Sequence, residues 1–185
     1  NVLKDDREIV LEAVKQDGHI LQYASAALKD DREIVLKAVK QNGNALEYAS
    51  SARQNDREIV LKAVKQKGAA LRNASAELQN DREIVLEAVK RYGYALEYAS
   101  DALKDNREIV LEAVHQNRHA LVYASPELQN GGLRDYINYV KRSMFNVTPN
   151  TFKKFMLPTY SHRPNRPSPI PPDFRSHIHI FKHIG

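Results

Sequence analysis

The chain has 185 residues, 42% of them apolar, so it is long enough to form a domain with a substantial core. It lacks an uncharged apolar stretch of about 18 residues, which argues against a membrane-spanning helix, and it lacks cysteine, which excludes disulfides, thiolate metal sites and cysteine nucleophiles. The net charge of +5 is uneven, because residues 1–129 are net −2 and residues 130–185 are net +7, so attraction to an anionic partner is expected in the C-terminal part.

Residues 5–129 are five copies of one 25-residue unit. A fixed period of this kind is typical of an array whose units bury their apolar faces by stacking on neighbours. Residues 1–4 align with the end of a unit, so we expect the sequence to start inside a longer array. The phrase Asp-Arg-Glu-Ile-Val-Leu-x-Ala-Val begins at Asp6, Asp31, Asp56, Asp81 and, with Asn in place of Asp, at Asn106.

Each unit is expected to open with a helix of about 11 residues. In the second copy, Asp30 is predicted to cap this helix, with Glu33 three residues later as its capping-box partner. The residues that follow are apolar around most of the helix, as expected for a helix packed between two neighbours. We therefore predict burial of Ile34, Val35, Val39 and Leu46, of their equivalents in the other units and of Leu86, and exposure of Lys37, Lys40 and Gln41.

A polar hinge and two short helical segments are predicted to complete each unit. Gly43 is expected to end the first helix in the left-handed conformation, where a Cβ is unfavourable. A short second helix follows, and Ser50 is expected to cap a third turn. Because no alternating strand pattern appears in the repeats, the sequence predicts an all-α, α-solenoid-like fold.

The polar residues that recur in every unit are interpreted as structural. A catalytic carboxylate pair is expected once, in a cleft, and not at every helix start. The repeated arginine is predicted to pair with an acidic residue of the neighbouring unit, so that a ladder runs along the array. These arginines are Arg7, Arg32, Arg57, Arg82 and Arg107, and the recurring serines are interpreted as caps.

The histidines do not predict a metal site. His115 and His119 are four residues apart, but the expected helix end falls between them. His177 and His179 lack a further ligand type nearby. With no phosphate-binding loop or catalytic triad spacing either, we predict that the chain is not an enzyme and holds no cofactor.

Three departures from the repeat admit two interpretations, relaxed packing or contact with a partner. Arg53 replaces a leucine, Asn73 replaces a tyrosine and Arg118 replaces a glycine. Tyr92 and Tyr94 place two aromatic side chains on an otherwise polar hinge. Aromatic residues are enriched in binding hot spots, so these two are candidate partner-binding residues; the alternative is that they cover a neighbouring loop.

The five copies resemble the family named domain of unknown function 4116, whose members carry tandem units with the same residue pattern and spacing. The resemblance covers residues 1–129. It implies a helical repeat fold, and it brings no catalytic residues to carry over.

The C-terminal part lies outside this resemblance. Residues 130–157 are predicted to form capping helices, because the apolar residues of 132–145 follow helical spacing. Residues 158–185 are predicted to be an extended, basic, proline-rich tail. This tail has too little apolar surface to order by itself, so we expect it to lie against protein, with a partner chain preferred. The predicted contacts are Arg163, Arg166, Phe174, Arg175, Ile178, Ile180 and Phe181.

The sequence therefore predicts a non-enzymatic protein–protein interaction scaffold or an accessory subunit of a larger assembly. Two alternatives remain: the repeat region of a larger enzyme or bacterial effector, and a nucleic-acid-binding α-solenoid. Nucleic acid is disfavoured because the array is slightly acidic. An intracellular or organellar location is favoured over secretion, and association with a membrane complex stays open.

Overall fold

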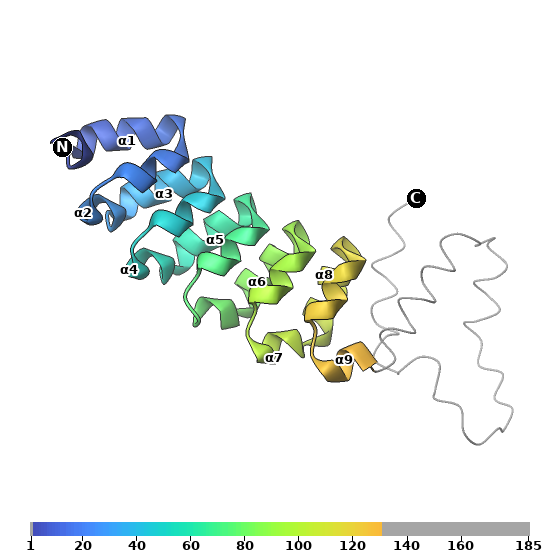
Figure 1. Cartoon of the computed structure of the whole chain (residues 1–185). Coiled ribbons are helices and arrows are strands. Elements are labelled where there is room, and N and C mark those ends of the chain that lie inside the picture. Colours follow the sequence, from blue (N-terminus) through green and yellow to red (C-terminus); the bar gives the residue numbers. More distant parts are fainter. Residues whose placement is uncertain (1, 131–185) are drawn as a thin grey trace, which may run out of the picture. The chain divides into compact units, whose positions relative to one another are not determined.

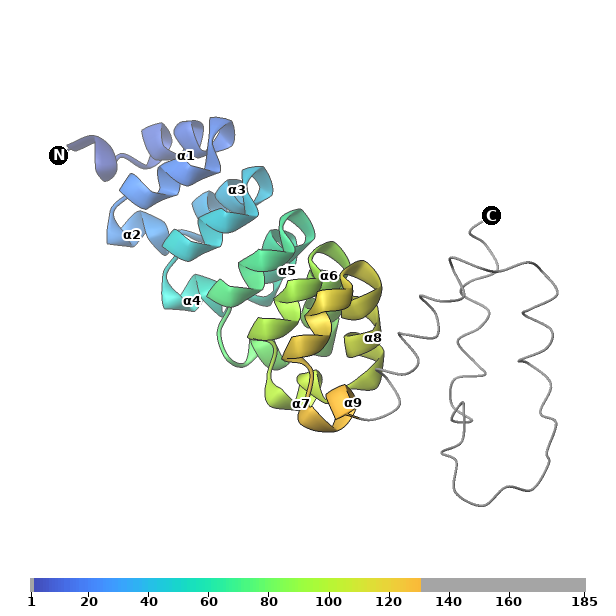
Figure 2. The same ribbon diagram turned by 45° about the vertical axis from the view of Figure 1, so that its right-hand side comes forward.

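The computed structural model describes residues 2–130, and within this range all regular structure is helical. Five 10-residue helices carry the repeated phrase and lie side by side in chain order along the array (Figure 1 and Figure 2). These are α1 (Arg7–Gln16), α3 (Arg32–Gln41), α5 (Arg57–Gln66), α6 (Arg82–Arg91) and α8 (Arg107–Gln116).

A six-residue 3-10 helix follows each long helix. In chain order these are η2 (Gly18–Tyr23), η3 (Gly43–Tyr48), η4 (Gly68–Asn73), η6 (Gly93–Tyr98) and η7 (Arg118–Tyr123). A shorter segment then completes the unit, and most of these segments lie along one edge of the array (Figure 1). They are α2 (Ala26–Lys29), α4 (Ser51–Gln54), η5 (Leu78–Asn80), α7 (Asp101–Lys104) and α9 (Pro126–Asn130), with η1 (Val2–Lys4) before the first unit. The repeat and its all-α character are confirmed.

The core runs through the array as the same set of small and branched side chains from each unit. In the third unit, Ile59, Val60 and Val64 of α5 and Leu71 of η4 have no exposed surface. They are covered on both sides because α5 packs against α3 and α6. Each unit thus buries its apolar residues against its neighbours, as expected for a stacked array.

The burial predicted from the sequence is confirmed at most positions, but Ile9 and Leu121, the equivalents of Ile34 and Leu46 in the first and last units, are exposed and half-buried, respectively. Ile34, Val35, Val39 and Leu46 are fully buried, and Lys40 and Gln41 are exposed. Lys37, predicted to be exposed, and Leu86, predicted to be buried, are both half-buried. Both side chains lie on the rim of a long helix, where the neighbouring units cover part of the surface and leave the rest open.

The start of each long helix differs from the predicted capping box. Asp31, and not Asp30, is the N-cap of α3, and its carboxylate accepts hydrogen bonds from the backbone N–H groups of Glu33 and Ile34. Glu33 is therefore two residues after the cap, and its side chain accepts a hydrogen bond from Arg7 of the preceding unit. The Glu33 carboxylate, predicted to complete a capping box within its own unit, instead joins two neighbouring units.

The hinge glycine has a different role from the predicted one. Asn42 turns the chain in an extended conformation (φ −146°, ψ 112°), and Gly43 does not adopt the left-handed conformation. A Cβ on Gly43 would lie 2.4 Å from the carbonyl oxygen of Ala63 in the next unit. The glycine is needed because the next long helix approaches its backbone too closely for any side chain.

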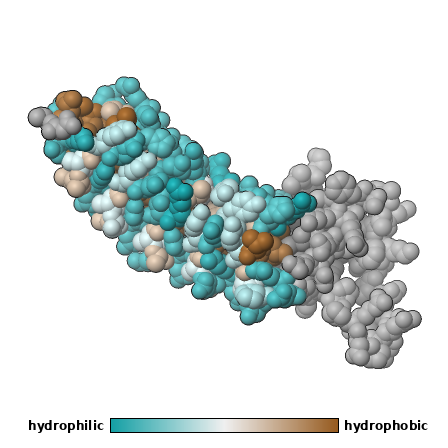
Figure 3. Space-filling view, viewed as in Figure 1, coloured by the Kyte–Doolittle hydropathy of each residue, from teal (hydrophilic) through white to brown (hydrophobic). Residues whose placement is uncertain are grey.

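The N-terminal end of the array exposes apolar residues whose counterparts in later units are buried. Ile9 is 46% exposed, whereas its counterpart Ile34 has no exposed surface, and Leu3 is 62% exposed. Among the described residues, no unit precedes α1 to cover these side chains. Apolar colour gathers at this end of the surface (Figure 3).

Candidate functional site

The predicted arginine ladder is present. In the first three long helices, the Nε atom of the first arginine donates a 2.8 Å hydrogen bond to the capping aspartate of the next unit, in the pairs Arg7–Asp31, Arg32–Asp56 and Arg57–Asp81. The same guanidinium groups reach the glutamate two residues further on, as in Arg7–Glu33 at 2.6 Å. Each of these arginines thus bridges two carboxylates of the following unit.

The ladder perturbs the acidity of its carboxylates. Partial burial pushes the pKa of Asp31 upward, but the hydrogen bond from Arg7 and those from the backbone of Ile34 and Glu33 outweigh it. The pKa of Asp31 therefore lies below its ordinary value, and Asp56 and Asp81 follow the same pattern. These carboxylates stay ionised and bound, which makes them poor proton-transfer groups.

A second ladder joins the short segments. The hydroxyl of Ser75 donates to the side-chain oxygen of Asn55 in its own unit at 2.5 Å, while the Ser75 backbone N–H donates to the carbonyl of Gln54 in the preceding unit at 3.0 Å. The same oxygen of Ser75 accepts a hydrogen bond from the Leu78 backbone. The predicted cap is confirmed at Ser50 and Ser100, the N-caps of α4 and α7, whereas Ser25 begins α2 without a side-chain hydrogen bond. Ser50, Ser100 and Ser125 make equivalent contacts.

Two of the three departures from the repeat have a structural explanation. Arg53 contacts the carboxylates of Asp30 at 3.3 Å and Asp56 at 3.5 Å, so an ion-pair network replaces the leucine found in other units. Arg118 begins η7 in the fifth unit, and no sixth copy of the repeat follows whose helix would exclude its Cβ. Nothing in the structure explains Asn73, whose amide nitrogen is buried without a hydrogen-bond partner among the described residues.

The remaining feature is a group of aromatic side chains on, and directly before, the 3-10 helices of the last two units. The rings of Tyr92 and Tyr94 meet edge to face with centroids 5.6 Å apart, and Tyr94 meets Tyr123 of the next unit in the same way at 5.9 Å. Such pairs are favourable beyond the area they bury. We call Tyr92, Tyr94 and Tyr123 the tyrosine cluster.

The tyrosine cluster is partly open to solvent. Tyr92 is 40% exposed, and Val122, next to Tyr123 in the chain, is 64% exposed. Burial and the neighbouring Glu97 carboxylate raise the pKa of Tyr123, and the same causes act on Tyr98. These phenol groups therefore remain protonated at neutral pH, with the Glu97 carboxylate as their neighbouring acceptor.

The described histidines do not come together. His115 lies at the end of α8 and His119 lies in η7, and the extended Asn117 separates the two elements, as predicted. Within residues 2–130, no group of three or more metal-ligating side chains is arranged to hold an ion. No helix in the same part of the chain is long and apolar enough to cross a membrane.

The structure places only some of the predicted site residues. Tyr92 and Tyr94 lie in the tyrosine cluster, one exposed and one half-buried against Tyr123. The predicted tail contacts Arg163, Arg166, Phe174, Arg175, Ile178, Ile180 and Phe181, and the predicted capping helices of residues 131–157, lie outside the described residues.

Sequence reasoning missed Tyr123 and Val122. Tyr123 occupies a position that is tyrosine in most units, so it looked like an ordinary repeat residue. The available signal was Val122, because the same position holds Gln22, Glu47, Arg72 and Glu97 in the other units.

The comparisons with known proteins agree with the repeat. No curated protein and no solved structure matches the chain. The family described as Domain of unknown function (DUF4116) matches four overlapping segments, residues 6–53, 31–79, 56–104 and 81–129. Each match spans two consecutive units of the array, and together they cover the five copies. The chain belongs to the DUF4116 family of helical repeat proteins.

Proposed function

We propose that this protein is a non-enzymatic interaction scaffold or accessory subunit that binds another protein through both its repeat surface and its C-terminal tail, with the tyrosine cluster as the anchor on the repeats. The observation that carries the proposal is the exposed aromatic group itself. Tyr92 and Val122 are open to solvent, and the other exposed large apolar side chains of the described array, Leu3, Ile9 and Tyr23, belong to its N-terminal end (Figure 3). Aromatic side chains flanked by polar groups are the usual anchors of protein interfaces.

The use of the recurring polar residues supports a non-enzymatic role. The repeated aspartates, glutamates and arginines hold one unit to the next, and the serines cap short segments. Each of these residue types has the same structural role in several units of the array. A catalytic group is instead expected at one position, with a pKa suited to proton transfer or nucleophilic attack.

The test exploits the repeat. In the second unit the positions of Tyr92 and Tyr94 are held by Asn42 and Asn44, so the double change Tyr92→Asn/Tyr94→Asn reproduces a hinge that the array already accommodates. The full chain and this variant are used as bait in its native extract under matched salt. We expect one or more stoichiometric partners to be lost from the variant while its helical circular dichroism is unchanged.

The matched control makes the same hinge in the first unit. Asp17→Asn/His19→Asn also yields the Asn-Gly-Asn hinge of the second unit, and Asp17 and Asn42 already accept the same local backbone hydrogen bond. This control is expected to keep the partners. Equal loss from both variants, or retention by both, contradicts a role for the tyrosine cluster. Partners that disappear on nuclease treatment instead support a nucleic-acid-binding solenoid.

A further inference from the structure

One position of the repeat changes its charge along the array. The residue five positions after the repeated arginine is Glu12 in α1, Lys37 in α3, Lys62 in α5, Glu87 in α6 and Glu112 in α8. The surrounding phrase is otherwise constant. The second and third units thus carry lysine where the other units carry glutamate.

The change of sign leaves the next lysine without its partner. In the first unit Lys15 contacts Glu12 at 2.9 Å, and in the fourth Lys90 contacts Glu87 at 3.5 Å. In the second and third units the equivalent lysines, Lys40 and Lys65, follow another lysine three residues earlier. Neither pairs with a carboxylate within residues 2–130.

The glutamates nearest these lysines are already engaged. Glu33 and Glu58 stand four residues before Lys37 and Lys62, a spacing that suits an ion pair on a helix. Glu33 instead accepts from Arg7 at 2.6 Å, and Glu58 accepts from Arg32 at 2.5 Å. The arginine ladder therefore neutralises the acidic residues of this surface, and the lysine charges remain uncompensated by the array.

A further lysine extends the surface at the hinge. Lys67 follows α5 at a position that holds Asp17, Asn42 and Asn117 in other units. It is exposed, as are Lys40, Lys62 and Lys65. Since α3 packs directly against α5, the lysines lie on two adjacent helices. We call Lys37, Lys40, Lys62, Lys65 and Lys67 the lysine face.

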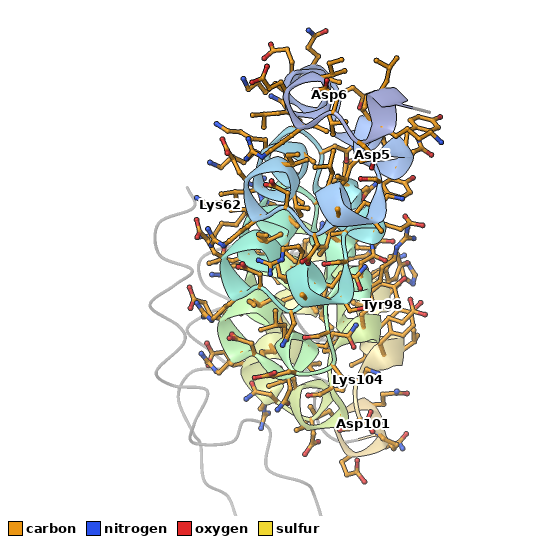
Figure 4. The ribbon with its side chains drawn as sticks, turned by 90° about the vertical axis from the view of Figure 1, so that its left-hand side faces the viewer. Asp5, Asp6, Lys62, Tyr98, Asp101 and Lys104 are labelled. Atoms are coloured by element: carbon orange, nitrogen blue, oxygen red, sulfur yellow. The ribbon has the colours of Figure 1, made fainter. Side chains whose placement is uncertain are left out.

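The helical part of the lysine face lies away from Tyr98, since Lys62 and Tyr98 lie on opposite sides in a view from the N-terminal end of the array (Figure 4). Lys67 occupies the position that Tyr92 holds in the next unit, so the lysine face reaches the hinge next to the tyrosine cluster. Like charges one turn apart destabilise a helix, so Lys37–Lys40 and Lys62–Lys65 are unfavourable arrangements until an anion neutralises them. This is a physical reason to expect an acidic ligand here.

We propose that the lysine face binds an acidic segment of a protein partner. Its footprint is two units, because in the flanking units Glu12 and Glu87 replace the lysine and pair with Lys15 and Lys90, so the row of uncompensated lysines is too short for a longer polyanion such as a nucleic acid that follows the array. Lysine is a compact charge that binds carboxylates without fixed geometry, whereas the bidentate arginines that favour phosphate are here occupied in the ladder. The inference adds a second surface to the proposed scaffold role.

The test swaps the variable position in both directions within the full chain. Lys37→Glu/Lys62→Glu gives the second and third units the glutamate that the other units carry, and Glu87→Lys/Glu112→Lys gives the fourth and fifth units lysine. Because the array holds both residues at this position, both variants are expected to fold. All proteins share residues 130–185, so differences in binding report the lysine face and not the basic C-terminal part.

The probe is a fluorescein-labelled oligoglutamate peptide of about 12 residues, titrated by fluorescence anisotropy at low salt. Lys37→Glu/Lys62→Glu is expected to weaken binding about tenfold or more, and Glu87→Lys/Glu112→Lys to strengthen it, with both differences reduced at about 0.5 M salt because exposed charges are screened. Carbodiimide cross-linking of the bound peptide, mapped by mass spectrometry, is expected to mark Lys40, Lys62, Lys65 or Lys67.

Three results overturn the proposal. The first is equal affinity of all three proteins, and the second is cross-linking confined to residues 130–185. The third is tighter, Lys37- and Lys62-dependent binding of an oligothymidylate of similar charge, which assigns the surface to nucleic acid. Tyr92→Asn/Tyr94→Asn is expected to bind the peptide normally, so failure here and failure of the tyrosine cluster are distinguishable.

Discussion

Arg82 shows how one substitution alters a contact between two units. Its guanidinium binds Glu108 at 2.5 Å, as the other ladder arginines bind their glutamates. The capping aspartate that completes the other pairs is replaced by Asn106, which still caps α8 by accepting from the Ile109 backbone. The junction between the fourth and fifth units thus keeps its cap and lacks one charge pair.

Restoring this charge is expected to stabilise the array. Asn106→Asp should provide a carboxylate for Arg82 in the geometry of Arg57–Asp81, where the two atoms are 2.8 Å apart. The pair is solvent-accessible, so the expected gain is about 0.2–1 kcal/mol in the free energy of unfolding. Urea denaturation at neutral pH measures it. In an Arg82→Gln background the same change should give a smaller gain, and an equal gain there contradicts the ladder explanation.

The gain is expected to depend on pH. Asp31, Asp56 and Asp81 have pKa values lowered from 3.8, so their contribution to stability is present above that ordinary value and is lost as the pH falls through the folded-state pKa. The carboxylate introduced by Asn106→Asp should behave in the same way. The difference in stability between this variant and wild type should therefore shrink below about pH 4. A difference that persists undiminished at about pH 2, below the ordinary range of an aspartate, contradicts the assignment.

The hinge glycine gives a second prediction for a single side chain. A Cβ on Gly68 would lie 2.3 Å from the carbonyl oxygen of Ala88, a backbone atom that cannot move away by a change of side-chain rotamer. Gly68→Ala is therefore expected to destabilise the array by about 1–3 kcal/mol through overpacking. Arg118→Ala, at the equivalent position of the last unit, should stay within about 0.5 kcal/mol of wild type. Thermal and urea unfolding compare the two, and equal effects contradict the close-approach explanation.

The apolar residues of each long helix occupy two kinds of position, fully buried and half-exposed. On α6, Ile84, Val85, Ala88 and Val89 are buried against the neighbouring units, and Leu86 lies on the half-exposed rim. The helix needs apolar side chains over most of its circumference because α5 and α8 both pack against it. The rim residue completes this surface without being enclosed.

The two classes of position are expected to differ in stability. Ile84→Ala should reduce the free energy of unfolding by about 2–5 kcal/mol, because the isoleucine has no exposed surface and its removal leaves a cavity. Leu86→Ala should cost less, since solvent already reaches that side chain. Chemical denaturation of both variants checks the order, and a larger effect at Leu86 contradicts the packing described for α6.

In the molecule as a whole, the repeats form their own compact unit, Asn1–Gly131. Because contacts run between neighbouring units, the stability of such an array is close to a sum of unit and junction terms. Deleting residues 158–185 is therefore expected to leave the thermal unfolding of the array nearly unchanged, while abolishing co-purification of the partner. Unfolding of the array after deletion would show that the tail supports the repeats, and retention of the partner would place binding on the repeats alone.

The period, the helical class, the arginine ladder and the buried residues Ile34, Val35, Val39 and Leu46 could all be predicted from the sequence. The sequence periodicity predicts these features, because each copy repeats the same buried positions and the same charge pairs. The cap was misassigned to Asp30, because adjacent aspartates offer the same chemistry and the backbone path selects Asp31. Gly43 was explained by local conformation, whereas the cause is the Ala63 carbonyl of the next unit.

The sequence predicts that an arginine ladder joins the units, but which particular side chains of different units meet could be known from the folded array alone. The contact of Tyr94 with Tyr123 joins residues of adjacent units, and the engagement of Glu33 by Arg7 depends on how α1 lies against α3. No local pattern contains these distances, because stacking sets them. A repeat specifies its own fold through short-range periodicity, but its surface chemistry depends on which substitutions stacking brings together.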